Sequence, residues 1–335
     1  MKNKMSIGLI GRTKFLLNTA QYLLDKGLKL DVIITSKNAS HDKIGINDFK
    51  IFAAKNKIKF YTFENINNPS AKKIIEDNNL DLGISVNNPL IIKKEILDLF
   101  KFGILNAHAG DLPRYRGNAC PNWAILKNEK KIAITIHFMS EKLDAGNIIL
   151  KKFFPIKSST NIKDFYDFAE IEIPKIFFDS IKKLKKNYKG KIQKGKILRT
   201  YPRNMIDGKI DWNDNISKID CLVRASGDPF FGAYTYLNSS KLIIIKAEKL
   251  TLKDDFLGEP GQIASRNKDG SVSVCCKDGI LKIIEIKYKN KIYKSPSKLI
   301  KTIHTKLGMD VEQEIENLNK KLDKILKIID SQKLS

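Results

Sequence analysis

Two polar side chains that could act on a carbonyl group, Asn106 and His108, stand two residues apart. They follow the apolar pair Ile104 and Leu105, which is typical of a strand, and residues i and i+2 of a strand point to the same side. The amide and the imidazole are therefore expected to enter one small space at a strand end. An amide can donate to a developing oxyanion, and an imidazole titrates near neutral pH.

The loop after this pair is rich in Gly, Pro and Arg and supplies two guanidinium groups, Arg114 and Arg116. Only seven of the 61 lysines and arginines are arginine. Where lysine is the usual cation, a position that holds arginine indicates a need for the planar fork that binds carboxylate or phosphate. Arg203 and Arg224 stand in two later motifs. These four arginines are candidate contacts to an anionic substrate.

The first half of the chain alternates strands with helices, which predicts an α/β fold with a largely parallel sheet. Ligands of such sheets bind at the carboxyl ends of the strands, where Asn106 and His108 are expected. No GxGxxG follows the first strand, so a dinucleotide cofactor is not indicated. We expect strands at 6–10, 30–35, 57–63, 80–86, 132–139 and 148–153, and helices at 15–24, 49–55, 70–78 (capped by Ser70), 91–100 and 162–184.

The pattern changes after a lysine-rich segment, 185–196, which we interpret as a linker. From Trp212 onward short strands with turn signals predict a small all-β, OB-like domain. The expected domains are a catalytic domain at 1–190, the β-rich domain at 200–300 and an amphipathic helix at 308–332.

The C-terminal helix carries apolar residues at intervals of 4, 3, 4, 3 and 4, which form a heptad seam. A short coiled coil between subunits and a helix packed on its own domain both remain open, and we expect a homodimer. The seam residues are Val311, Ile315, Leu318, Leu322, Ile325 and Ile329.

The formal net charge is +24 over 335 residues. Lysine is spread along the whole chain, whereas a nucleic-acid binder usually concentrates its charge on one face, so a nucleic-acid partner is disfavoured. Neither a signal peptide nor a bilayer-spanning run is evident, and we expect a cytoplasmic protein without membrane insertion. The four cysteines show no CxxC spacing, and no metal site is indicated.

Three motifs in order resemble the formyltransferases that use N10-formyltetrahydrofolate: 106–108 (Asn-Ala-His), 112–117 (Leu-Pro-Arg-Tyr-Arg-Gly) and 143–146 (Leu-Asp-Ala-Gly). Segments 201–212 and 222–233 are similar to the second domain of two branches of that family, methionyl-tRNA formyltransferase and the sugar N-formyltransferases. The resemblance covers about residues 5–290. It implies a Rossmann-like catalytic domain with Asn106, His108 and Asp144 as the catalytic residues.

The sugar branch is favoured on sequence. The tRNA enzymes carry a long basic insertion after the second strand, whereas segment 36–47 is short here and contains Asp42. Asn118 stands where the enzyme for UDP-4-amino-4-deoxy-L-arabinose has Arg, so a different nucleotide sugar is expected. We expect a dTDP- or UDP-linked amino sugar with its amine at C4 or C3, used for surface polysaccharide or lipopolysaccharide. Methionyl-tRNA formylation is the alternative, and a non-catalytic folate- or nucleotide-binding regulator is a third hypothesis.

The resemblance also implies the binding residues. The folate is expected on Leu90, Ile91 and Ile92 and under the segment that holds Ser140, Leu143 and Asp144. The substrate is expected on Arg114, Arg116, Asn118, Arg203 and Arg224, although Arg224 could instead pair with Asp228 or Asp211. His108 could serve as base or oxyanion partner, and Asp144 could orient it or accept a proton through water. His137 is expected to be structural or to support the catalytic residues.

Overall fold

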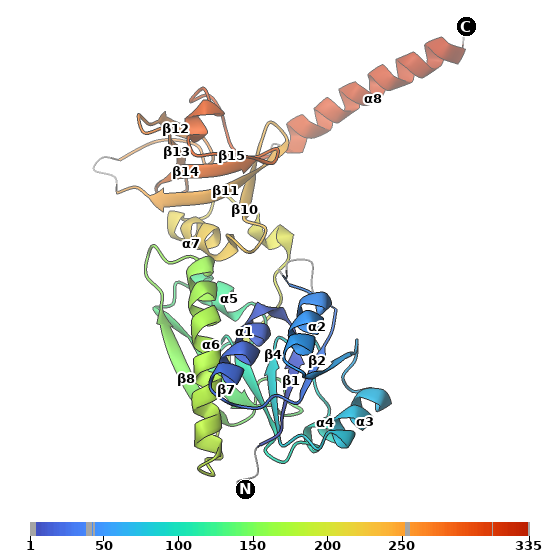
Figure 1. The fold of residues 1–335 in the computed structure, drawn as a ribbon. Helices are drawn as coiled ribbons and strands as arrows, with labels where there is room; N and C mark the ends of the chain where they lie inside the picture. The colour runs from blue at the N-terminus through green and yellow to red at the C-terminus, as the bar shows by residue number, and fades with distance from the viewer. Residues whose placement is uncertain (1–4, 38–41, 43, 252–254, 310, 334–335) are drawn as a thin grey trace. The chain divides into compact units, whose positions relative to one another are not determined.

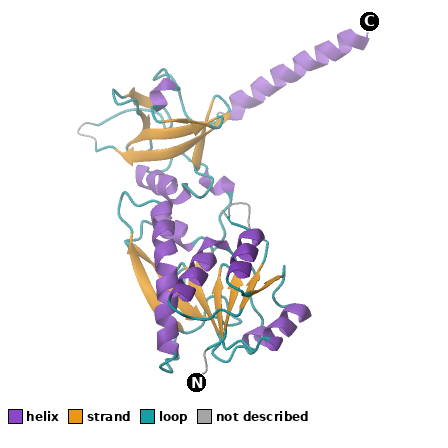
Figure 2. Cartoon of the chain, in the orientation of Figure 1, coloured by secondary structure: helices purple, strands orange, loops and turns teal. Residues whose placement is uncertain are grey.

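The structure is a computed structural model that describes residues 5–37, 42, 44–251, 255–309 and 311–333. The chain divides into two compact units, Met1–Arg203 and Asn204–Ser335. Figures 1 and 2 show their helices and strands.

A seven-stranded sheet in the order β3-β2-β1-β4-β5-β7-β8 forms the centre of the first unit. The first five members are parallel to one another, β7 is antiparallel to β5, and β8 is antiparallel to β7. This confirms the largely parallel α/β sheet that the alternation of elements predicted. The strands are β1 (Ile7–Gly11), β2 (Val32–Thr35), β3 (Lys59–Thr62), β4 (Leu82–Val86), β5 (Ile104–His108), β7 (Lys131–Phe138) and β8 (Ile148–Pro155).

Helices cover both faces of this sheet (Figure 1). One apolar core lies between the sheet and α1 (Thr13–Asp25), α2 (Ile46–Lys55) and α6 (Ile162–Leu184). A second core contains residues of α3 (Pro69–Asp77) and α4 (Lys94–Leu97). The strand order reverses between β1 and β4, and open α/β sheets bind ligands outside the carboxyl ends of strands at such a point.

Three local predictions in this unit need correction. The cap of α3 is Asn68, whose side chain accepts from the Ala71 amide at 2.7 Å, rather than Ser70. The Asn-Pro pair explains this, because proline favours the first helical position directly after the cap. The helix expected at 91–100 is only the single turn α4. Segment 185–196 is not a free linker, because Lys191 pairs with Ile148 through two backbone hydrogen bonds of 2.8 Å.

The second unit has an antiparallel sheet in the order β10-β11-β14-β13-β12. Strand β15 pairs with residues 286–288 of β14, beyond the part of β14 that pairs with β13. This confirms the C-terminal all-β fold. Its strands are β10 (Ala233–Leu237), β11 (Ser240–Lys249), β12 (Ile263–Arg266), β13 (Val272–Cys275), β14 (Ile280–Tyr288) and β15 (Lys291–Tyr293).

A helix that the sequence reading omitted, α7 (Ile216–Ser226), packs on this sheet. Its signals were present: Asn215 caps it by accepting from Lys218, and Ile219 and Val223 recur at helical spacing to enter the core. The C-terminal helix is α8 (Val311–Lys333). No helix among the described residues is both long enough and apolar enough to span a bilayer.

Candidate active site

Strand β5 carries Asn106 and His108 at its carboxyl end, as the spacing predicted. Its residues Ile104 and Leu105 are buried, and its partners are β4 on one side and β7 on the other. In the register with β7, Asn106 lies opposite His137 and His108 lies opposite Thr135. The geometry of the antiparallel pair therefore places a second histidine beside the first.

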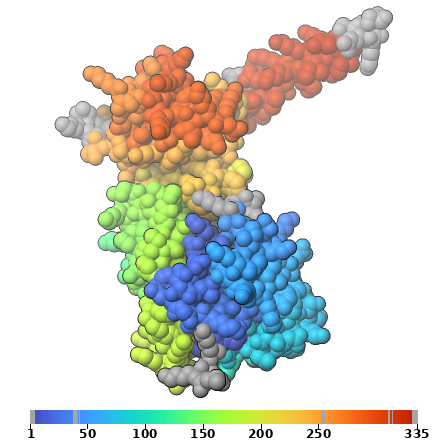
Figure 3. Space-filling model, viewed as in Figure 1, coloured from blue at the N-terminus to red at the C-terminus, as the bar shows by residue number. Residues whose placement is uncertain are grey.

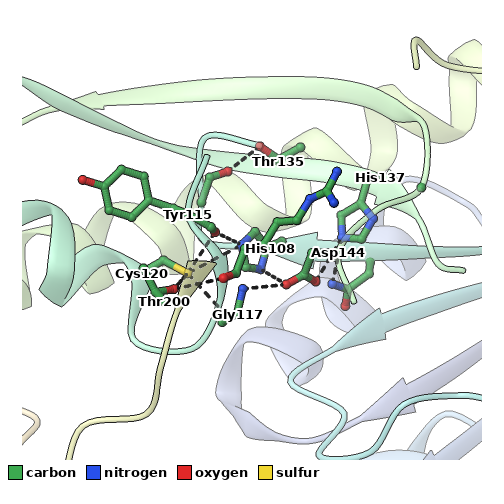
Figure 4. Close-up of polar contacts among 12 residues, drawn as sticks. His108, Tyr115, Gly117, Cys120, Thr135, His137, Asp144 and Thr200 are labelled. Carbon is green, nitrogen blue, oxygen red and sulfur yellow. Dashed lines mark hydrogen bonds and ion pairs between the residues drawn. The ribbon is translucent and has the colours of Figure 1, made fainter. Parts of the chain in front are cut away.

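The loop after β5 folds back onto His108 because residue 110 is glycine. A Cβ on Gly110 would lie 2.4 Å from Nε2 of His108 and 2.3 Å from the carbonyl oxygen of Tyr115. That carbonyl lies 2.6 Å from Nε2 (Figure 4). Since a carbonyl oxygen only accepts, Nε2 of His108 carries a proton and donates it. The ring nitrogen that can gain or lose a proton is therefore Nδ1.

Asp144 faces Nδ1 of His108. Its Oδ2 lies 3.5 Å from that nitrogen and accepts a hydrogen bond of 2.9 Å from the Gly117 amide (Figure 4). The loop can approach the sheet because residue 146 is glycine, where a Cβ would lie 1.9 Å from the carbonyl oxygen of Phe138. All three sequence motifs, 106–108, 112–117 and 143–146, thus meet at the carboxylate of Asp144.

His137 holds the amide of Asn106. Its Nδ1 donates to the carbonyl of Phe138 at 2.7 Å, so the neutral ring accepts at Nε2, where Nδ2 of Asn106 lies at 3.2 Å. Burial lowers the pKa of His137, and the neighbouring charge of His108 lowers it further. A neutral His137 fixes which end of the Asn106 side chain is the nitrogen, leaving the second hydrogen of that nitrogen available.

His108 has the opposite protonation preference. Burial lowers its pKa, but Cys120, the carboxylate of Asp144 and the carbonyl of Tyr115 outweigh burial and raise the pKa to about 9. At neutral pH this favours an imidazolium whose Nδ1–H faces Asp144. The pKa values of the two buried histidines are therefore shifted in opposite directions although their ring centroids lie only 6.2 Å apart.

A short sheet closes the site from a distant part of the chain. Strand β6 (Arg116–Gly117) pairs in parallel with β9 (Arg199–Thr200). The Cys120 thiol lies 3.1 Å from the Tyr115 carbonyl and 3.2 Å from the Thr200 hydroxyl. Cys120 thus supports the carbonyl that His108 contacts, and its sulfur also lies 3.6 Å from Nε2 of His108.

The sequence reading missed Gln193, which lies in the segment interpreted as a linker. Its Nε2 donates to the carbonyls of Asp144 and Gly146, both at 2.8 Å. Its Oε1 accepts from Arg116, at 3.2 Å from Nε and 2.6 Å from one terminal nitrogen. One amide therefore joins the Asp144 loop to the arginine loop. A lone glutamine in a lysine-rich stretch was the only signal.

The residues expected to bind folate lie on two segments. Leu90 and Ile91 expose their side chains after β4, whereas the Ile92 side chain is buried in a core. Asn67 and Asn88 donate to the carbonyls of Ile91 and Leu90, respectively. In the other segment the Ser140 hydroxyl donates to the Lys142 carbonyl at 3.0 Å, and Leu143 precedes Asp144.

The arginines expected at the substrate have different surroundings. Arg114 is half exposed and paired with Glu129 at 2.6 Å, and Arg116 is buried against Gln193. Arg203 lies over the ring of Trp123 at 5.9 Å. Arg224 is buried in the second unit, where its Nε lies 3.0 Å from Asp220. Asp220, one helical turn earlier, is thus a partner of Arg224 that the sequence reading did not consider.

Asn118, the remaining residue expected at the substrate, is exposed, and its backbone N–H donates to the Thr200 carbonyl at 3.2 Å. No group of three side chains suited to a metal ion occurs among the described residues. The cluster provides an acid, a carboxylate and an oriented amide, which is the equipment for acyl transfer.

Comparisons with known proteins show the family of this chain. The family model described as formyl transferase matches residues 9–179, and the formyl transferase C-terminal domain matches 204–303. The methionyl-tRNA formyltransferase of Ruminiclostridium cellulolyticum is 28% identical over 289 residues, covering 85% of this chain and 92% of that protein. The methionyl-tRNA formyltransferase of Clostridium tetani is 32% identical over 259 residues, covering 74% and 80%.

Among solved structures, an N-formyltransferase from Helicobacter canadensis in complex with folinic acid and dTDP-3-aminofucose has a TM-score of 0.64 at 22% identity. The match covers 83% of this chain and 98% of that one, and it shows a common fold. The chain belongs to the formyl transferase family. It is an enzyme of formyl transfer.

Proposed function

We propose that the acceptor is the primary amine of a nucleotide-linked amino sugar, dTDP- or UDP-linked at its anomeric carbon. The observation that carries this proposal is the segment between β2 and α2. It spans only residues 36–45, with two lysines and one aspartate. Arg12 points its cation at Asp42, 3.6 Å away, and donates to the carbonyl of Lys37. Where the tRNA enzymes present a long basic insertion, this short segment carries two lysines against one aspartate, a net charge of only +1.

The geometry suggests how the side chains divide the chemistry. The neutral amine attacks the formyl carbon, and negative charge develops on the formyl oxygen. The oriented Asn106 amide and the imidazolium of His108 donate to that oxygen. Asp144 accepts the proton that the amine loses, directly or through water, and the departing folate nitrogen takes a proton in turn. The raised pKa of His108 supports the donor role over that of a resting base.

The formyl donor fits the carboxyl end of β4. A flat heteroaromatic ring needs apolar contact and a few polar groups. Leu90 and Ile91 are 41% and 53% exposed there. The Ser85 hydroxyl, opposite Asn106 in the β4–β5 register, is buried without a hydrogen-bond partner among the described residues. We assign the donor to this segment and to the loop 140–144.

The diphosphate of the acceptor requires cationic donors near the loop after His108. Within the first unit, Arg114 and Arg203 are the candidates, and exposed Asn118 lies between them in sequence. Arg116 is engaged by Gln193 and is assigned to bracing the loop. Arg224 is assigned to the stability of α7, because its guanidinium is bonded to Asp220 inside that helix.

Methionyl-tRNA formylation is the second candidate, and two observations favour it. The relatives described above carry that name. Segment 182–206 also holds ten lysines and arginines and no acidic residue. Such a composition suits a surface that binds the phosphate backbone of a nucleic acid.

A direct competition of acceptors tests the proposal. Purified protein is supplied with N10-formyltetrahydrofolate and either a panel of dTDP- and UDP-linked 3-amino and 4-amino sugars or methionyl initiator tRNA. We expect turnover on a nucleotide sugar and none on the tRNA. Turnover on the tRNA alone would overturn the sugar proposal and establish the second candidate.

Variants of the three catalytic residues test the assigned chemistry in the same assay. Asn106→Ala, His108→Ala and Asp144→Ala should each lower kcat by about 100-fold or more, the scale of lost acid–base or oxyanion groups. Binding of the formyl donor, measured by calorimetry, should remain within about threefold of wild type. Near-normal kcat in His108→Ala would refute its catalytic assignment.

A further inference from the structure

Helix α8 exposes a continuous apolar stripe. The helix has 23 residues. In proteins most helical stability comes from packing of an apolar face rather than from intrinsic propensity. The exposed fractions of the stripe range from 42% to 59%. Its members are Val311, Ile315, Leu318, Leu322, Ile325, Leu326, Ile328 and Ile329.

Six of these residues follow the heptad spacing, so they would face a second helix along the whole length of the stripe. If the partner helix is the same segment running in the opposite direction, each layer combines similar side chains. Ile315 meets the partner's Ile325, Leu318 meets the partner's Leu322, and Val311 meets the partner's Ile329. The β-branched residues valine and isoleucine then pack on one another, and leucine packs on leucine.

The charges of α8 separate along its length. Residues 311–319 contain three glutamates and no cation, whereas 320–329 contain four lysines and one aspartate. Glu314 accepts a hydrogen bond from the Ser239 hydroxyl, and Lys320 lies 2.5 Å from Glu316. A parallel pair would set the acidic halves side by side and the basic halves side by side. An antiparallel pair sets each acidic half against a basic half.

We infer that α8 is the contact surface for a second copy of this chain, which it binds as an antiparallel two-helix coiled coil. The helix supplies both kinds of complementarity that self-association needs, an apolar seam that matches itself and a charge pattern that matches its own reverse. The inference is drawn from helix α8 of the second unit alone, so it does not depend on which acceptor the enzyme formylates.

The mass of the full-length protein in solution tests the contact. Light scattering at tens of micromolar should give twice the 38.1 kDa of one chain. Leu322→Glu places a charge in the seam and should give the single-chain mass. Asn317→Glu places the same charge outside the seam on the same helix and should leave the dimer intact. Both variants should keep the wild-type melting temperature and formyl transfer.

Cysteine cross-linking tests the orientation, with little background because the four native thiols are buried. Ile315→Cys and Ile325→Cys proteins carrying different affinity tags are mixed and oxidised. An antiparallel pair should give the mixed cross-link between positions 315 and 325. A parallel pair would link position 315 to itself, which would overturn the orientation.

Three other outcomes would overturn the contact itself. These are a wild-type chain of single mass, a dimer that survives Leu322→Glu, and an assembly larger than two. The first would indicate that the stripe is covered within one chain, and the second that the chains meet elsewhere.

Discussion

Gln193 offers a sharp test of the site geometry because its two amide atoms serve different loops. Replacement by methionine keeps the length of the side chain and removes all of its hydrogen bonds. Two of these bonds, to the carbonyls of Asp144 and Gly146, hold the loop that carries the carboxylate proposed as catalytic. A net hydrogen bond contributes about 1 kcal/mol, so the held position of the loop loses about 2 kcal/mol. If only the held loop is competent, its population falls by up to about 30-fold.

We therefore expect Gln193→Met to lower kcat by about 10- to 30-fold. Gln193→Glu separates the two roles of the side chain. A carboxylate still accepts from Arg116, but it cannot donate to the Asp144 loop and would face two carbonyl oxygens. Both variants should lose activity if the hold on the loop matters, whereas only the methionine variant should lose it if the hold on Arg116 matters.

Lys194→Met is the matched control, because Lys194 is the exposed neighbour in the same segment. Initial rates with saturating N10-formyltetrahydrofolate and acceptor give kcat for each variant, and thermal melting checks that the fold is intact. Rates within twofold of wild type in both Gln193 variants, with unchanged melting, would refute the reasoning.

Three further predictions follow from the surroundings of single residues. Because the pKa of His108 is raised to about 9, the donor form is present below that pH, and kcat should fall as pH rises through about 9. Cys120→Ala removes one cause of the raised pKa and should move this limb of the pH–rate profile to lower pH. An unmoved limb would contradict this account of the His108 pKa. Arg203→Lys should raise the KM for the nucleotide sugar without changing the KM for the folate. Arg224→Lys should leave both KM values unchanged and lower the melting temperature by several degrees. A buried charge-assisted hydrogen bond such as that between Arg224 and Asp220 contributes about 1.5–3 kcal/mol. His137→Ala should lower both melting temperature and kcat, because it removes a buried ring and the acceptor that orients the Asn106 amide, and kcat at the wild-type value would contradict that second role.

The sequence was most informative where local patterns decide the structure. Alternating apolar strands and helices predicted the parallel sheet, and α6 has the bounds that its apolar periodicity indicated. Spacing along β5 was sufficient to place Asn106 and His108 at a strand end. Each of these inferences uses neighbours within a few residues.

Contacts between distant segments were beyond that reasoning. The pairing of Asn106 with His137 depends on the register of two antiparallel strands, which no local pattern specifies. Gln193 reaches Asp144 from 49 residues away in sequence. The partner of Arg224 was within reach, since Asp220 is one turn earlier, but α7 had to be recognised first.

The pairing of β6 with β9 has a consequence for how the site is made. All three side chains proposed as catalytic have been synthesised once the chain reaches Asp144, yet Thr200, which bonds back to Arg116, lies 84 residues beyond that arginine in sequence. A nascent chain or a truncated product that ends after α6 would therefore contain every reacting group without the strand that closes the loop around His108. Formyl transfer is expected to begin only after the chain has been extended past Thr200, so the catalytic unit cannot be shortened to the end of its last long helix.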